Sequence, residues 1–164
     1  MKKYDAIIIG AGPMGIFTAY ELMLKAPEMK VLLIDKGNDI YHRNCPILAK
    51  KIKQCPKDMY GNSGCKPACS ITCGFGGAGA FSDGKLSLSR EVGGDFPSLV
   101  GEDIAQDYID YTDKIYLEFG ADEHVEGAEQ TAEIREIRKS APIAGLRLVD
   151  CPIRHLGTEK AHDL

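Results

Sequence analysis

Residues 4–15 read Tyr-Asp-Ala-Ile-Ile-Ile-Gly-Ala-Gly-Pro-Met-Gly. A short apolar run leads directly into the pattern Gly-x-Gly-x-x-Gly, which predicts a β-strand followed by a tight turn. The residues after the turn that repeat at helical spacing are Ile16, Ala19, Tyr20 and Met23. Gly10 is expected to make the turn, Gly12 to let another molecule approach the backbone, and Gly15 to let the helix pack closely on the strand.

A second apolar run, Val31–Ile34, follows Pro27 and ends at Asp35, twenty residues after Gly15. An acid at this place is expected to hydrogen-bond the ribose hydroxyls of a dinucleotide and to disfavour the 2′-phosphate of NADP. The positive end of the helix would face the phosphates, and Pro13 suits the first helical turn. Residues 1–36 are therefore predicted to form a βαβ unit that binds a dinucleotide.

Composition excludes several classes of partner. The chain has 164 residues, 27% of them charged, and a formal net charge of −4, so it carries no basic footprint for nucleic acid. No apolar run reaches the roughly 18 residues that span a bilayer. Lys2 and Lys3 precede an apolar run as in a signal peptide, but Asp5 and three glycines within the run argue against export. A cytoplasmic location and a small-molecule substrate are expected.

The rest of the chain divides into residues 37–90, rich in cysteine and glycine, and residues 91–164. We expect both to continue an α/β, Rossmann-like domain that is incomplete here, because a doubly wound sheet needs more strands than residues 1–36 supply. Residues 91–164 would lead into a C-terminal part beyond this chain. The missing strands predict exposed apolar sheet surface.

Periodicity outside the βαβ unit predicts three helices and one strand. The helices are expected at residues 47–52, 102–119 and 131–139, and the strand at residues 145–150. Gly120 is expected to end the second helix. The tyrosines of this helix are interpreted as core or interface residues rather than catalytic ones.

Residues 74–86 form a second glycine-rich stretch, Gly-Phe-Gly-Gly-Ala-Gly-Ala-Phe-Ser-Asp-Gly-Lys-Leu. Its glycines let the backbone pass close to a planar ring or to phosphates, with N–H groups free to donate. Gly77, Ala78 and Gly79 are therefore candidates for cofactor contact. Lys85 is either a cation beside the cofactor or an exposed surface lysine.

Three stretches of the sequence resemble motifs of known flavoproteins. The loop at residues 10–15 with Asp35 resembles the FAD-binding unit of flavoproteins with two dinucleotide-binding domains. Residues 76–86 and 154–158 resemble motifs of the predicted FAD-dependent dehydrogenases of bacteria and archaea, which are several hundred residues long. The resemblance implies a flavin-dependent oxidoreductase that transfers hydride, with NAD(P)H as an electron donor of the full-length protein.

The resemblance also implies which residues contact FAD. In this group the cofactor-facing positions would be Gly10, Gly12, Pro13, Met14, Gly15, Asp35, Lys36, Gly77, Ala78, Gly79 and Lys85. A lysine or N–H near the flavin would stabilise its reduced anionic form. An NAD-binding dehydrogenase unit is the alternative enzyme. No catalytic residue is assigned, since paired carboxylates and Ser-His-Asp patterns are absent. His155 is either a proton-transfer group or a surface hydrogen-bonding residue.

The cysteines remain open to three interpretations. Cys65, Cys69 and Cys73 could ligate zinc or an iron–sulfur cluster, with Cys45 or Cys55 as a fourth ligand. They could instead form a redox disulfide or stay unligated thiols. The Cys-x-x-Cys spacing that is common in both metal sites and redox pairs is absent. A Cys-ligated electron-transfer module is accordingly an alternative function for the chain.

Overall fold

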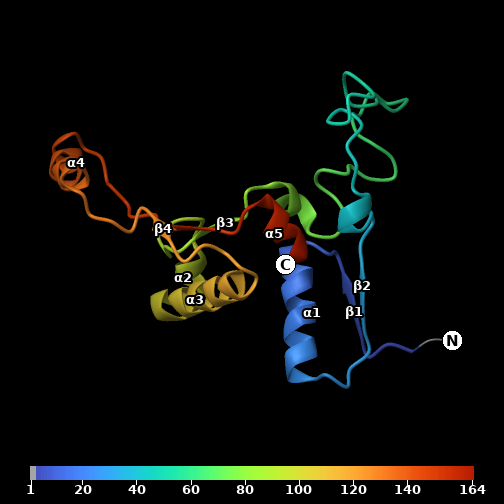
Figure 1. The fold of residues 1–164 in the computed structure, drawn as a ribbon, viewed down its shortest axis with the longest axis horizontal. Helices are drawn as coiled ribbons and strands as arrows, with labels where there is room; N and C mark the ends of the chain where they lie inside the picture. Colours follow the sequence, from blue (N-terminus) through green and yellow to red (C-terminus); the bar gives the residue numbers. More distant parts are fainter. Residues whose placement is uncertain (1–2) are drawn as a thin grey trace. The chain divides into compact units, whose positions relative to one another are not determined.

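The computed structural model describes residues 3–164, which form a mixed α/β chain with two small sheets (Figure 1). The chain divides between Ser82 and Asp83 into two compact units. Within residues 3–164, no helix combines the length and the apolar character needed to cross a bilayer.

The first unit begins with the strand–helix–strand order predicted from the sequence, which is confirmed. Strand β1 (Ala6–Ile9) pairs in parallel with β2 (Val31–Ile34), and Ile9 lies opposite Ile34. Helix α1 (Pro13–Lys25) connects them and contacts both strands (Figure 1). Parallel strands require such a crossover, and the helix covers one face of the pair.

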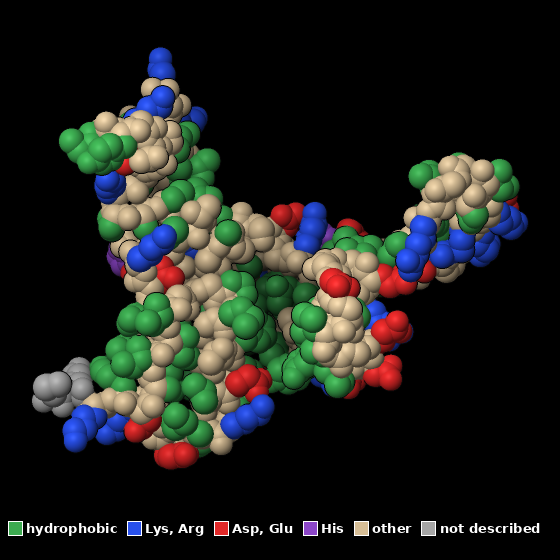
Figure 2. All heavy atoms as spheres, turned by 180° about the vertical axis from the view of Figure 1, so that it is seen from behind, with side chains coloured by type: hydrophobic (Ala, Val, Ile, Leu, Met, Phe, Trp, Pro, Cys, Tyr) green, Lys and Arg blue, Asp and Glu red, His purple; other side chains and the backbone are tan. Residues whose placement is uncertain are grey.

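The face of this sheet away from α1 carries exposed apolar side chains. Ile9 is 84% exposed and Ile7 is 59% exposed, because alternate strand residues point to opposite faces. Figure 2 shows hydrophobic side chains gathered on the surface of this unit. The exposed apolar sheet surface predicted from the strand count is therefore present.

Residues 37–76 contain little regular structure. They hold the short 3₁₀ helix η1 (Ile40–His42) and a single antiparallel bridge between Lys57 and Ser63. The helix predicted at residues 47–52 is wrong. Hydrogen-bonded turns occupy that stretch, and Lys50 has φ +56°, which a right-handed helix cannot accommodate. The unit closes with the 3₁₀ helix η2 (Gly77–Phe81).

The second unit contains an antiparallel sheet and most of the remaining helices. Its strands are β3 (Lys85–Ser87), β4 (Val125–Glu126) and β5 (Ile153–His155), in the order β3-β5-β4. Its helices are α2 (Phe96–Val100), α3 (Glu102–Glu118), α4 (Ala132–Ile143) and α5 (Thr158–Asp163).

The predicted helices at residues 102–119 and 131–139 are confirmed as α3 and α4. Gly120 follows α3 with φ +86°, as its expected role at the helix end requires. The strand predicted at residues 145–150 is wrong, because those residues have no regular structure and Leu146 is 66% exposed. Pairing begins only at Ile153, which lies opposite both Ser87 and Glu126.

Small side chains dominate the buried positions of residues 3–164. The buried apolar residues are Ala11, Ala80, Ala105, Ile115, Ala121 and Leu156. Two charged residues, Arg43 and Arg154, are also buried. Each has hydrogen-bond partners, as a buried charge requires.

Candidate functional site

The loop between β1 and α1 has the geometry that its glycines predict. Gly10 has φ +102°, a conformation that favours glycine, and its N–H donates to the Ile34 carbonyl at 2.7 Å. A Cβ on Gly15 would lie 1.8 Å from the Gly10 carbonyl oxygen, so only glycine lets α1 start this close to the strand. Gly12 has φ −78°, and no atom lies within 4 Å of the place that its Cβ would take.

Gly12 is the N-cap of α1 and supplies no side-chain hydrogen bond to the helix. The first N–H groups of a helix have no intrahelical partner and carry partial positive charge. Met14, in the first turn, is 84% exposed. The N-terminus of α1 is therefore exposed, and the Gly12 backbone beside it has no side chain that would block a ligand. This is the arrangement that binds phosphate groups.

Asp35 ties the end of β2 to this loop. Its Oδ2 accepts the N–H of Ala11 at 2.9 Å, and its Oδ1 accepts the N–H of Gly37 at 2.8 Å. These backbone bonds, first that of Ala11, hold the pKa of Asp35 below its ordinary value, and the charge of Lys36 adds to the effect. The N–H of Gly74 also lowers the pKa of Asp35, and the two carboxylate oxygens together offer about four lone pairs, so the group can still accept a hydroxyl hydrogen.

The second glycine-rich stretch lies directly against the first. The N–H of Gly76 donates to the Ala11 carbonyl at 2.8 Å. A Cβ on Gly77 would lie 3.1 Å from the Gly12 Cα. Gly79 has open space where its Cβ would be, and both it and Ala78 are exposed. The structure thus brings together Gly12 and Gly77, which sequence analysis had singled out separately.

Arg43 holds this second stretch in place, and sequence analysis did not identify it. Its guanidinium donates to the carbonyls of Ser70 (2.9 Å), Ile71 (2.6 Å) and Phe75 (2.5 Å). It also stacks 4.7 Å from the centre of the Phe81 ring. A single basic residue in an irregular segment gives no sequence signal for such a role, since its partners are all backbone carbonyls.

Within the second unit, the end of the glycine-rich motif (residues 83–86) contacts the motif at residues 154–158. Lys85 lies opposite His155 in the sheet, and the N–H of Gly157 donates to the Asp83 carbonyl at 3.0 Å. The Lys85 ammonium lies 2.9 Å from Asp83 Oδ2, an interaction that raises the pKa of the lysine. His155 Nε2 lies 3.1 Å from Glu126 Oε2. Lys85, Asp83 and Glu126 are thus charged side chains near the half-buried His155.

Arg154 anchors the same strand to a helix. Its guanidinium makes a bidentate pair with Asp113 of α3, at 2.7 and 2.8 Å, and donates to the carbonyls of Asp122 and Glu123. The carboxylate raises the pKa of Arg154. The motif at residues 154–158 is thus held by a buried ion pair, which gives Arg154 a structural role.

All six cysteines are free thiols. Among residues 3–164, no three His, Cys, Asp or Glu side chains are grouped to hold a single metal ion. The N–H groups of Thr72 and Ile71 hydrogen-bond to the Cys69 sulfur and lower its pKa. Burial, followed by the nearby sulfurs of Cys69, Cys55 and Cys45, raises the pKa of Cys65.

Comparison with known proteins yields two short matches. The chain is 49% identical over 45 residues to an uncharacterized protein of Methanosarcina barkeri, covering 27% of this chain and 11% of that protein. It is 40% identical over 40 residues to a mitochondrial L-2-hydroxyglutarate dehydrogenase of Caenorhabditis elegans, covering 24% of this chain and 9% of that enzyme. The matches thus span about a tenth of each relative. No family model and no solved structure matches the chain.

Proposed function

We propose that residues 3–82 bind the adenosine diphosphate part of FAD, as the cofactor-binding segment of a flavin-dependent oxidoreductase with a Rossmann-like fold. The observation that carries this proposal is the open backbone at Gly12. It stands at the N-terminus of α1, between Asp35 and the Gly77 turn. The short similarity to a dehydrogenase agrees with an oxidoreductase.

Each part of this cradle has a role that follows from its chemistry. The pyrophosphate would lie against Gly12 and the first N–H groups of α1, because a side chain there would occupy the same space. The Asp35 carboxylate would accept the ribose hydroxyls, and its negative charge disfavours a 2′-phosphate. The open backbone of Ala78 and Gly79 lies next along the chain from the Gly77 contact, which fits a cofactor that extends from one loop to the other.

When bound, FAD would supply the hydride chemistry, and this chain would bind and orient it. Lys85 belongs to the second unit, where it pairs with Asp83. A contact of Lys85 with FAD stays a prediction from the resemblance. We also propose a cytoplasmic location, in which the six thiols would stay reduced.

The test is a fluorescence titration of the chain with FAD, ADP and NAD. Gly12→Ala is the key variant, because its methyl group meets no protein atom and its φ suits any residue. We expect it to fold like the wild type and to weaken FAD and ADP binding at least about 100-fold, or about 2.8 kcal/mol. Met23→Ala, an exposed change in the same helix, is the control that should bind normally.

Two results would overturn the proposal. Unchanged FAD affinity in the Gly12→Ala variant would show that the glycine loop is not the phosphate site. Binding of NAD with no binding of FAD would move the chain to the class of NAD-dependent dehydrogenases.

A further inference from the structure

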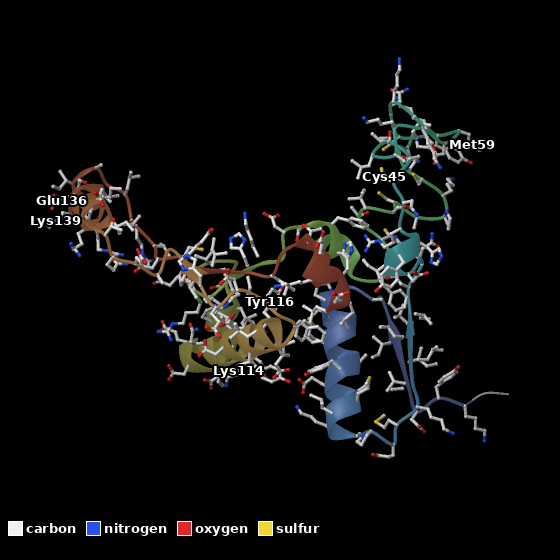
Figure 3. The ribbon with its side chains drawn as sticks, viewed as in Figure 1. Cys45, Met59, Lys114, Tyr116, Glu136 and Lys139 are labelled. Carbon is white, nitrogen blue, oxygen red and sulfur yellow. The ribbon has the colours of Figure 1, made fainter. Side chains whose placement is uncertain are left out.

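Four of the six cysteines line one hollow in the first unit. The hollow has a volume of about 380 Å³, and its thiols come from Cys45, Cys55, Cys65 and Cys69. Cys73, which the sequence groups with Cys65 and Cys69, is not among its lining residues. Figure 3 shows Cys45 on the irregular segment that carries these cysteines, with Met59 farther toward its tip.

Local backbone bonds bring these thiols together from separate turns. The Lys57–Ser63 bridge and the bond from the Gly64 N–H to the Pro56 carbonyl (2.9 Å) close a small hairpin. Cys55 and Cys65 directly flank that hairpin, so the two chain ends that carry them are neighbours. Cys69 begins a turn closed by the Cys73 N–H, which donates to the Cys69 carbonyl at 2.8 Å.

The remaining lining of the hollow is apolar. It includes Pro46, Ile47, Leu48, Ile52, Ile71 and Phe81. Four thiols among apolar side chains are ligands of the soft kind, which select zinc, copper or iron–sulfur clusters over calcium or magnesium.

A cluster and a single ion differ in the spacing that they require of their thiolate ligands. Zinc held by four thiolates at about 2.3 Å brings the sulfurs within about 3.8 Å of one another. Among residues 3–164, no three His, Cys, Asp or Glu side chains are placed to hold one ion, although the four thiols share one hollow. A core of iron and sulfide stands between its thiolate ligands and therefore holds them farther apart around a central space.

One further feature suits an anionic cluster. The buried guanidinium of Arg43 donates to the carbonyls of Ser70 and Ile71 and lies over the Phe81 ring, and these three residues line the hollow. Arg43 thus provides positive charge behind the wall of the hollow.

From these observations we propose that Cys45, Cys55, Cys65 and Cys69 ligate an iron–sulfur cluster in this hollow. The site does not depend on the flavin proposal, because its ligands are separate from the Gly12 cradle.

The experiment uses the whole chain, purified without oxygen and reconstituted with ferrous iron and sulfide. Iron, acid-labile sulfide, zinc and flavin are each counted per chain, and the dithionite-reduced sample is measured by electron paramagnetic resonance. We expect iron and sulfide in equal amounts, with at least about two of each. Flavin is released with acid and counted separately from iron and sulfide. Flavin without a cluster would contradict only the cluster proposal, and a cluster without flavin would contradict only the FAD proposal.

Cys55→Ser and Cys73→Ser are matched variants. Cys55 is exposed at the hollow, and its replacement should abolish the resonance signal and the bound sulfide while circular dichroism stays unchanged. Cys73→Ser should keep both. Zinc without sulfide, no bound metal in the wild type, or equal loss of the cluster in both variants would overturn the assignment.

Discussion

Replacing Asp35 by asparagine tests the link between the two strand ends. The carboxylate accepts one N–H on each oxygen, from Ala11 and from Gly37. An amide has only one acceptor oxygen, so its NH₂ group would face one of these two donors. Ala11 is fully buried, and its N–H has no route to water if that bond is lost.

The magnitude follows from these two bonds. Losing one hydrogen bond to a charged acceptor costs about 1.5–3 kcal/mol, and a buried donor without a partner adds to it. We therefore expect Asp35→Asn to lower the free energy of unfolding of the first unit by about 3 kcal/mol. Asp5→Asn is the matched control, because its exposed carboxylate accepts only one backbone N–H, from Lys30, which an amide oxygen can still accept.

The assay is urea unfolding followed by circular dichroism, with amide exchange at Ala11 as a local measurement.

The stabilisation that Asp35 provides depends on pH in one direction only. Because folding lowers the pKa of Asp35, its stabilisation is fully present above the unfolded value near 3.9 and is lost as pH falls through the lower folded value. A difference from wild type below about 0.5 kcal/mol at pH 7, or one that grows as the solution is acidified, would refute this reasoning.

Three other substitutions have clear expectations. Gly15→Ala should destabilise the first unit by about 3 kcal/mol or more, because its Cβ overlaps the Gly10 carbonyl, and a normal urea midpoint would contradict that overlap. Arg43→Lys should lose two of three carbonyl bonds and increase protease cleavage between residues 45 and 75, and an unchanged cleavage rate would argue against the clamp. Asp113→Asn should cost the second unit about 3 kcal/mol by leaving Arg154 without its carboxylate, and thermal unfolding would show no shift if the pair is dispensable.

The errors of prediction share one cause. Residues 145–150 alternate like a strand, but a strand forms only where its backbone groups find a partner, and the sheet pairs Ile153–His155 instead. In this register the guanidinium of Arg154 reaches Asp113 and the carbonyls of Asp122 and Glu123, so the buried charge is satisfied. Residues 47–52 have apolar positions at helical spacing, yet they are too few to stabilise a helix and fold as turns.

The sequence by itself determined the βαβ unit, the glycine turn and the helices α3 and α4. Those features depend on apolar periodicity and on glycine sterics within a few residues. Only the tertiary structure decided which distant segments meet: Gly77 against Gly12, Arg43 against three carbonyls, and four thiols around one hollow. Such contacts join residues tens of positions apart, so they depend on how the whole chain satisfies its buried hydrogen bonds and charges.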